Sequence, residues 1–162
     1  MRLNLGSGQK HMDGYVNVDI SSDHGHQIDV EADVSGPLPF DDCVAEGIIA
    51  EHILEHIYLH KQEAALREWW RILKPGGHLV ICVPDLEALA KAYLSGKIDF
   101  FIYAANKFGP YNGNDADFHK WGFDERELRN RLGVIPWQSI TRGASGAPVA
   151  RDWWILEVAC IK

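Results

Sequence analysis

The stretch Leu3-Asn4-Leu5-Gly6-Ser7-Gly8 decides the fold of this 162-residue chain. It places two glycines and a serine directly after a short strand-like run, Arg2 to Leu5. Glycine lets the backbone turn sharply after a strand, and it lets a ligand approach main-chain atoms that a Cβ would shield. Because two glycines follow a strand in many loops, the stretch gains its meaning from the elements that come after it.

Short β-rich runs alternate with helical patterns along the rest of the chain. The strand-like runs cover residues 15–20, 28–34, 45–50 and 78–83, the helical patterns cover 59–73, 86–93 and 124–132, and two further strand-like runs, 137–141 and 153–161, close the chain. Such alternation is typical of a parallel sheet covered by helices. The Gly-, Ser- and Pro-containing link between the last two runs favours an antiparallel hairpin. We therefore predict a three-layer α/β/α Rossmann-like open sheet, mostly parallel, with a C-terminal antiparallel hairpin.

The helical patterns carry recognisable ends. Lys74-Pro75-Gly76-Gly77 stops the longest one, in which Ala65, Trp69 and Ile72 share one face. Asp124 is placed to cap the amide of Glu127 at the start of the last one. Between Ser95 and Trp121 no period is visible, so we expect a long loop with at most one helical turn. Long loops in compact domains are usually lids or binding loops, and we expect residues 95–121 to form the substrate loop.

Charge and cysteine usage limit the partners of the chain. The net charge is −7, with 16 Lys and Arg against 23 Asp and Glu. Because phosphate binding needs a basic face and none is visible, we expect no nucleic-acid partner. Cys43, Cys82 and Cys160 lie far apart without metal-ligand spacing, which is typical of a reduced cytoplasmic protein. No apolar run approaches the roughly 18 residues of a membrane helix, and we expect no signal peptide, because Met1 runs straight into a strand-like stretch. We expect a single domain, 1–162, whose oligomeric state the composition leaves undefined.

Two acidic residues follow strand-like runs where a nucleoside could bind. Asp19 ends the run Asn17-Val18-Asp19, and a carboxylate there is well placed to accept hydrogen bonds from the two hydroxyls of a ribose. Asp33 lies in Ala32-Asp33-Val34, where its carboxylate could accept a hydrogen bond from the exocyclic amine of an adenine.

These elements, in this order, resemble the class I S-adenosyl-L-methionine-dependent methyltransferases. The likeness is strongest to the small methyltransferases of the type 11 group, many of them associated with polysaccharide and cell-surface biosynthesis. The phrases that carry it cover nearly the whole chain apart from the loop between Ser95 and Phe118. They are LNLGSG (3–8), GYVNVDI (14–20), ADVSGPLPFDD (32–42), AEHILEHI (50–57), REWWRILKPGGHLVICVPDLE (67–87) and HKWGFDERELRNRLG (119–133).

The resemblance implies a seven-stranded sheet with S-adenosyl-L-methionine lying across the C-terminal ends of the first four strands. Mapped onto this chain, the cofactor-binding residues are Gly6, Ser7 and Gly8 for the methionine part, Asp19 for the ribose, Asp33 and Val34 for the adenine, and Glu51 with His52 at the end of the fourth strand. The chain departs from the family in one respect: only residues 9–14 separate the glycine loop from the second strand, where relatives usually carry a full helix. Since a parallel crossover usually needs a dozen or more residues, we expect this one to be shortened.

The spelling His52-Ile53-Leu54-Glu55-His56 leaves a second chemistry open. It matches the H-x-x-E-H pattern of inverted zinc peptidases, in which two histidines one helical turn apart bind the metal. No distant Glu stands out as a third ligand, and the same spelling is common in the methyltransferases that the chain resembles. We therefore expect no metal site, and keep a zinc-dependent hydrolase using His52 and His56 as the least favoured alternative.

Two residues are candidates for a catalytic base. Asp85 follows the fifth strand at the edge where open α/β sheets bind substrates, although it is equally suited to cap the next helix. His119 ends the irregular stretch, and an imidazole titrates near neutrality, although a surface histidine anchored by Trp121 is the simpler interpretation. We expect a methyltransferase that acts on a small molecule, such as a sugar or a cell-surface precursor. The alternative from another class is an inactive cofactor-binding or interaction module.

Overall fold

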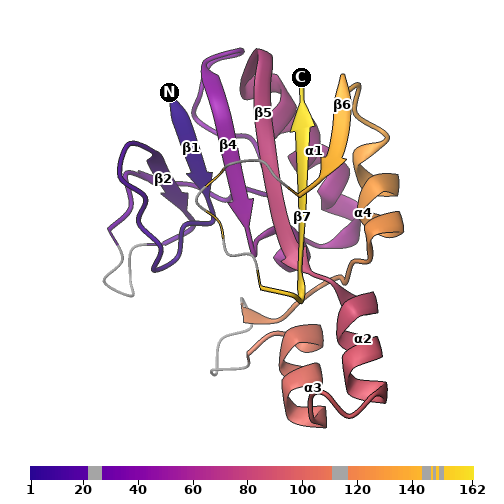
Figure 1. The fold of residues 1–162 in the computed structure, drawn as a ribbon. Coiled ribbons are helices and arrows are strands. Elements are labelled where there is room, and N and C mark those ends of the chain that lie inside the picture. Colours follow the sequence, from indigo (N-terminus) through magenta and orange to yellow (C-terminus); the bar gives the residue numbers. More distant parts are fainter. Residues whose placement is uncertain (22–26, 111–116, 144–146, 148, 150–151) are drawn as a thin grey trace.

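The computed structural model of the chain describes residues 1–21, 27–110, 117–143, 147, 149 and 152–162 (Figure 1). Within these residues seven strands form one sheet in the order β3-β2-β1-β4-β5-β7-β6. The strands are β1 (Arg2–Leu5), β2 (Val16–Asp19), β3 (Val30–Glu31), β4 (Ala45–Glu51), β5 (Leu73–Pro84), β6 (Ser139–Arg142) and β7 (Ile155–Ile161). The helices are η1 (Leu54–His56, a 3-10 helix), α1 (Leu59–Ile72), α2 (Leu86–Leu94), α3 (Phe100–Phe108) and α4 (Glu125–Leu132).

The predicted fold class is confirmed. The first five strands pair in parallel, and β7 pairs antiparallel with both β5 and β6. The chain runs outward through β1, β2 and β3 and then returns to the other side of β1 as β4. In open α/β sheets this reversal opens a crevice at the carboxyl ends of the strands. The sheet therefore places its ligand crevice where β1, β2 and β4 end.

Two parts of the prediction were wrong in detail. The stretch 95–121 holds a full helix, α3, whose first turn is capped by the Asp99 side chain accepting from the Ile102 amide at 2.8 Å. β5 begins at Leu73 rather than at residue 78, because Leu73 already pairs with Ala45 before the chain passes through the glycines. The end of α1 at Ile72 and the capping of Glu127 by Asp124, at 2.7 Å, are confirmed.

The first crossover is as short as predicted, and side-chain amides stabilise it in place of a helix. The Asn17 side chain, fully buried, accepts from the Asn4 amide at 2.9 Å and from the Met12 backbone N–H at 2.9 Å. Its own amide donates to Asp29 at 3.0 Å. Because buried polar groups are costly unless they are hydrogen-bonded, this network keeps residues 9–14 against the sheet.

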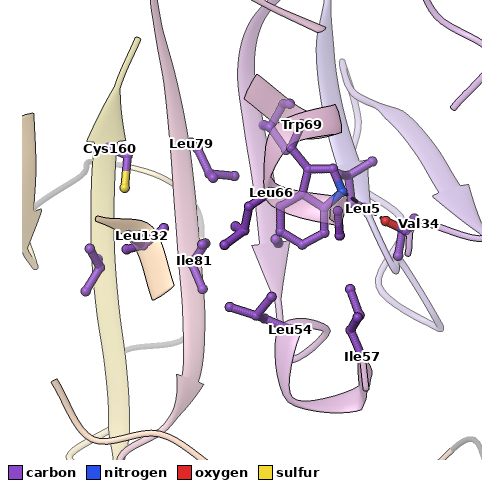
Figure 2. Packing of buried hydrophobic residues seen from close by; sticks show 14 of the residues in the cluster. Leu5, Val34, Leu54, Ile57, Leu66, Trp69, Leu79, Ile81, Leu132 and Cys160 are labelled. Carbon is purple, nitrogen blue, oxygen red and sulfur yellow. Dashed lines mark hydrogen bonds between the residues drawn. The ribbon is translucent and has the colours of Figure 1, made fainter. Parts of the chain in front are cut away.

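The larger hydrophobic core lies between the sheet and the helices α1 and α4 (Figure 2). Trp69, Leu66 and Ile72 of α1 and Leu128 and Leu132 of α4 are fully buried in it. Figure 2 shows the Trp69 ring among Leu5, Leu54 and Ile57, with its indole nitrogen turned toward Val34. The indole N–H donates to the Val34 carbonyl at 3.0 Å. Helix α1 is thus hydrogen-bonded to Val34, the residue after β3 that the family resemblance assigns to adenine binding.

A smaller apolar cluster forms on the opposite face of the sheet. It gathers Met12, Ile49, Val80 and Cys82, and no residue of a described helix takes part. The compressed crossover, rather than a helix, supplies Met12 to this face, so the third layer is thin here. Cys160 is buried in the larger core and Cys82 in the smaller one, and burial raises the pKa of the Cys160 thiol to about 12. In the described part of the chain, none of the helices combines the length and apolarity that crossing a membrane requires.

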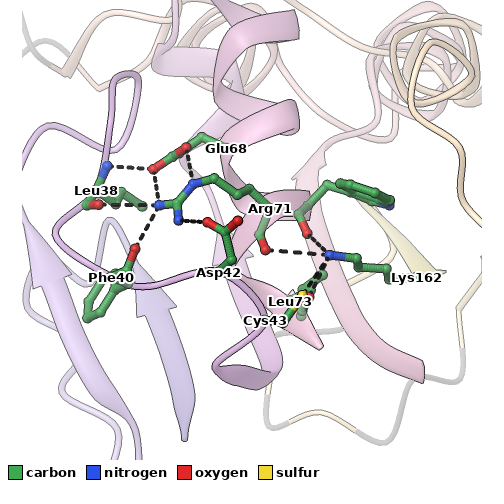
Figure 3. A network of polar contacts seen from close by, with 9 residues as sticks. Leu38, Phe40, Asp42, Cys43, Glu68, Arg71, Leu73 and Lys162 are labelled. Atoms are coloured by element: carbon green, nitrogen blue, oxygen red, sulfur yellow. Dashed lines mark hydrogen bonds and ion pairs between the residues drawn. The ribbon is translucent and has the colours of Figure 1, made fainter. Parts of the chain in front are cut away.

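Arg71 and Lys162 form hydrogen bonds that stabilise the loop before β4 and the end of α1 (Figure 3). The Arg71 guanidinium donates to Glu68, to Asp42 and to the Phe40 carbonyl, the last at 2.8 Å. Glu68 also accepts from the Leu38 amide at 2.7 Å. The Lys162 ammonium donates to the carbonyls of Trp70 and Leu73 at 2.8 and 2.7 Å, next to the end of α1, whose last carbonyls have no partner within the helix.

Glu68 makes a pH-dependent contribution to stability. The hydrogen bond from Arg71 holds the pKa of its carboxyl below the ordinary value of 4.5, against the opposing effect of burial. A lowered carboxyl pKa adds stability above the unfolded-state pKa, and that stability is lost as the pH falls through the folded-state pKa. We expect Glu68→Gln to be destabilised relative to the parent at pH 7 and the difference to shrink below about pH 4.5. Urea unfolding at several pH values measures it, and a constant difference from pH 7 to 3 would contradict the assignment.

Candidate active site

A cavity of about 450 Å³ opens at the carboxyl ends of β1, β2 and β4. Its walls come from the glycine loop, the ends of β2 and β4, the segment after β3, and the start of α1. The lining residues are Gly6, Gly8, Asp19, Ile20, Ser21, Ala32, Asp33, Val34, Ser35, His52, Ile53, His56, Ile57, Tyr58, Lys61, Asp117 and Lys120. This is the crevice that the sheet reversal creates.

The two glycines of the loop are required for different reasons. Gly6 and Gly8 have φ of 65° and 49°, a region that side chains with a Cβ rarely adopt. A Cβ on Gly6 would lie 2.6 Å from Ile53, whereas a Cβ on Gly8 would meet no atom within 4 Å. Gly6 therefore allows close packing beneath the cavity, and Gly8 leaves space open above the loop for a ligand.

Asp19 is fixed by the backbone that surrounds it. One carboxyl oxygen accepts from the Gly8 N–H at 2.6 Å, and the other accepts from the Ile20 N–H at 2.7 Å. Each oxygen of an ionised carboxyl has capacity for a further hydrogen bond. Asp19 lines the cavity, so this remaining capacity is available to a ligand with neighbouring hydroxyls.

Asp33 and Val34 line the same cavity after β3. The Asp33 carboxyl accepts from the Ser35 N–H at 2.9 Å, which shapes the turn and keeps the side chain at the exposed rim. Val34 is buried, with 6% of its surface exposed, and its carbonyl is held by Trp69. An apolar wall and a carboxyl at the rim suit a flat heterocycle that carries an amine.

Two predicted cofactor residues lie beside the cavity rather than on its wall. Ser7 is buried, and its Oγ has no hydrogen-bond partner among the described residues. Glu51, at the end of β4, forms an ion pair with Lys10. Their predicted contact with the cofactor stays a prediction. The other six residues of that prediction, Gly6, Gly8, Asp19, Asp33, Val34 and His52, all line the cavity.

His52 follows β4 with φ of 53° and faces a buried glutamate. Its Nδ1 lies 3.1 Å from Glu55 Oε1, and Glu55 is fully buried. Burial alone lowers the pKa of His52, but the hydrogen bond and the charge of Glu55 outweigh it, so the net pKa is raised. The left-handed backbone at residue 52, followed by the 3-10 turn η1, makes the chain reverse direction within the H-x-x-E-H motif at the end of β4.

A second cavity of about 410 Å³ adjoins the first, and His52, His56 and Asp117 line both. The other lining residues of the second cavity are Pro84, Ala105, Asn106, Pro110, His119, Asp152, Trp154 and Ile155. Four of these eight, Ala105, Asn106, Pro110 and His119, come from the stretch predicted as the substrate loop, as does the shared Asp117.

His119 lies inside this second cavity. Its backbone N–H donates to Phe108 at 2.9 Å, and its ring contacts the His56 ring edge to face with centroids 4.8 Å apart. Burial lowers its pKa, and Glu55 opposes that shift only in part. The imidazole is therefore neutral at pH 7, with a lone pair on one ring nitrogen.

Asp85 has a structural task. Its side chain caps α2 by accepting from the Glu87 and Ala88 N–H groups, both at 3.1 Å, and its other oxygen lies 3.2 Å from Arg142. It is 5% exposed and lines neither cavity. The capping interpretation is confirmed, and a catalytic role for Asp85 stays a prediction that this geometry does not favour.

Sequence reasoning missed Lys61, Asp117 and Lys120 on the first cavity and Trp154 on the second one. No local pattern marks them, because they come from three separate segments that the fold brings together. Lys120 had one signal: its neighbour His119 was singled out, and the Lys120 N–H donates to the Glu55 carbonyl at 2.7 Å. That bond ties the segment after the loop to η1.

Comparison with known proteins agrees with this geometry. The sequence profile of a family described as "Methyltransferase domain" matches residues 9–81. The ubiquinone/menaquinone biosynthesis C-methyltransferase of Citrobacter koseri is 32% identical over 87 residues, 52% of this chain. The chain spans about a third of the length of that relative, 32%.

Solved structures cover nearly the whole chain at low identity. A SAM-dependent methyltransferase from Methanosarcina mazei is 18% identical with a TM-score of 0.63 over 99% of this chain and 91% of its own. The Burkholderia thailandensis 1,6-didemethyltoxoflavin-N1-methyltransferase, solved with its substrate and S-adenosylhomocysteine, is 17% identical with a TM-score of 0.59 over 99% and 70%. Residues 9–81 thus match the profile of a methyltransferase domain, and the whole chain has the fold of solved S-adenosyl-L-methionine-dependent methyltransferases.

Proposed function

We propose that this chain transfers a methyl group from S-adenosyl-L-methionine to a small molecule. The observation that carries the proposal is the pair of adjoining cavities that share His52, His56 and Asp117. Methyl transfer from a sulfonium is an in-line displacement, so it needs a donor and an acceptor held end to end. Positioning alone can supply roughly 7–11 kcal/mol in favourable cases, and two adjoining cavities provide that positioning.

The residues of the first cavity fit the cofactor. A volume of about 450 Å³ lies in the range of small-molecule sites. Asp19 would accept from the ribose hydroxyls, Val34 and Asp33 would contact the adenine, and the open side of Gly8 would admit the methionine part. The Ser7 hydroxyl belongs to the same loop, is buried and has no hydrogen-bond partner among the described residues, so it would serve the same end. When bound, the cofactor supplies the activated methyl group.

The lining of the second cavity favours a polar acceptor such as a sugar or a cell-surface precursor. Asn106, Asp117 and Asp152 offer hydrogen bonds to hydroxyls, and Trp154 offers an apolar face. We infer that the described parts of the stretch 95–121 form the substrate-facing wall, since Ala105, Asn106 and His119 belong to them. We take residues 1–162 as a single domain, because β1 at one end and β7 at the other join one sheet.

His119 is the residue we assign to proton removal from the acceptor, because it lines the second cavity while Asp85 does not. His119→Ala is expected to lower turnover by roughly 100-fold or more, in the range of general-base contributions. Cofactor affinity should not change, because His119 does not line the first cavity. Measuring kcat checks the predicted loss of turnover, and measuring S-adenosylhomocysteine binding checks that cofactor affinity is unchanged. Unchanged turnover in the folded variant would remove the assignment.

A product search tests the proposal as a whole. The full chain is incubated with methyl-labelled S-adenosyl-L-methionine and a panel of sugars, nucleotide sugars and lipid-linked sugar precursors, and products are identified by mass. Labelled product with the parent and none with Asp19→Ala would support the proposal. Tight cofactor binding with no labelled product across the panel would favour the inactive binding module instead.

We further propose a cytoplasmic protein with no nucleic-acid partner, in line with its free cysteines and its charge of −7.

A further inference from the structure

Glu55 is a buried carboxyl that the proposed methyl transfer does not use. Its side chain is fully buried, and one oxygen, Oε1, contacts His52. The other oxygen, Oε2, receives no hydrogen bond from the described residues. A buried polar atom left unsatisfied destabilises the fold, and more so when the group is charged. An interaction that the protein alone does not supply is therefore expected at Oε2.

Two histidines lie next to this carboxyl. His56 follows Glu55 in η1, and His119 is brought beside it because the Lys120 and Trp121 N–H groups both donate to the Glu55 carbonyl, at 2.7 and 3.1 Å. One ligand atom from each of Glu55, His56 and His119 lies within 4.8 Å of the others. Three side chains that can each donate a lone pair thus converge, one of them with an unsatisfied oxygen.

We propose that Glu55, His56 and His119 bind a divalent transition-metal ion such as Zn²⁺. Two imidazoles and one carboxyl are a ligand set that zinc uses at catalytic sites, where the fourth position stays open. Ligands about 2.1 Å from a tetrahedral ion lie roughly 3.4 Å apart, so modest rotations of the imidazole rings complete the geometry. The hard oxygen-only ligand sets that Ca²⁺ and Mg²⁺ prefer are absent from this trio.

The remaining side chains around the trio fit a metal site. His52 holds Glu55 Oε1 at 3.1 Å and so orients the carboxyl, as partners behind metal ligands commonly do. The sequence motif H-x-x-E-H therefore contributes Glu55 and His56 as ligands and His52 as the residue that orients them. This differs from the zinc-peptidase pattern, in which His52 and His56 would both be ligands.

The site lies where an acceptor would bind, since His56 and His119 line the second cavity. If the proposed methyl transfer holds, an ion there would bind an oxygen or nitrogen of the acceptor at its open position and lower its pKa. A metal-bound His119 could not also take up a proton, so the acceptor, with its pKa lowered by the ion, would release its proton to water. Metal binding itself does not depend on the methyl transfer.

The test uses the full chain, freed of any affinity tag and treated with a chelator. Calorimetric titration with Zn²⁺ and the visible spectrum with Co²⁺ measure binding and geometry. We expect one ion per chain, intense tetrahedral Co²⁺ bands, and loss of both in His119→Ala and Glu55→Gln. His52→Ala should bind roughly 10- to 100-fold more weakly, because Glu55 loses its orienting partner. The matched control is His60→Ala, an exposed histidine of α1, which should bind as the parent does.

Circular dichroism establishes that each variant is folded. His119→Gln is used in place of His119→Ala if the alanine variant does not fold. The inference is overturned if the folded parent binds no Zn²⁺, or if His119→Ala and His119→Gln bind it as the parent does. S-adenosylhomocysteine is titrated into the same samples. Zinc binding without cofactor binding would reject the proposed function and keep the metal site, whereas the reverse result would reject only the metal site.

Discussion

Asp19→Ala is expected to weaken S-adenosylhomocysteine binding by roughly 100-fold or more, which corresponds to about 2.7 kcal/mol. Hydrogen bonds to a charged group contribute about 1.5–3 kcal/mol each, and the carboxyl is placed to accept two from a ribose. The variant also removes the acceptors of the Gly8 and Ile20 N–H groups, so the glycine loop loses its anchor. Both effects act on the same cavity. Calorimetric titration of parent and variant measures the loss.

Asp13→Ala is the control for that experiment. It removes the same charge from the neighbouring crossover, where the Asp13 side chain is exposed and outside the cavity. Its affinity should equal that of the parent. If both variants bind equally well, Asp19 does not hold the ribose, and the assignment of the first cavity to the cofactor loses its main support.

Trp69→Ala should produce the largest loss of stability, about 3–5 kcal/mol, the usual cost of deleting a buried aromatic side chain. Trp69 is fully buried among residues of β1, η1 and the segment after β3, as Figure 2 shows. Its loss also leaves the Val34 carbonyl without its 3.0 Å hydrogen bond at the cofactor cavity. We expect urea unfolding to show the destabilisation and the folded variant to bind cofactor more weakly.

Trp70→Ala provides the matched comparison on the same helix. Trp70 is only partly buried, and its ring lies under the Lys162 ammonium, 3.9 Å from the ring centroid. We expect it to cost less than half as much stability as Trp69→Ala and to leave cofactor affinity unchanged. Equal losses from the two variants would contradict the packing shown here.

The sheet could be predicted from the sequence because its strands carry local signals. The continuous apolar run 78–83 and the glycines after Leu5 each mark an element without knowledge of the rest of the chain. Asp19, Asp33 and Val34 could be placed for the same reason, since Asp19 ends β2 and the other two lie within three residues of the end of β3. Position at a strand end then fixes position at the cofactor cavity.

Helix α3 could not be predicted because it has no buried residue. A helix is recognised in a sequence by an apolar stripe facing a core, and Phe100, Phe101 and Ile102 are consecutive and all exposed. The remaining signal is local: Asp99 stands where an N-cap belongs and Gly109 follows the last turn. These two residues bracket the helix more reliably than its hydrophobic pattern does.

The trio of Glu55, His56 and His119 could not be predicted because its members are 64 residues apart in sequence at the widest. The spelling H-x-x-E-H pointed to His52 and His56 on one helical face, but the backbone at His52 is left-handed and η1 is a single 3-10 turn. In this geometry the Glu55 side chain is buried and the His52 ring contacts its carboxyl. The hydrogen bonds from residues 120 and 121 to the Glu55 carbonyl bring His119 to the site.

The most direct test of the central claim is calorimetric titration of the folded parent chain with S-adenosyl-L-methionine and S-adenosylhomocysteine. We predict micromolar binding of both ligands, on the order of −8 kcal/mol. The cavity lined by Gly8, Asp19 and Val34 is present despite the shortened crossover. No detectable heat from either ligand, in a sample whose circular dichroism shows a folded protein, would contradict the account. It would mean that the crossover of residues 9–14 has removed the cofactor site from this fold.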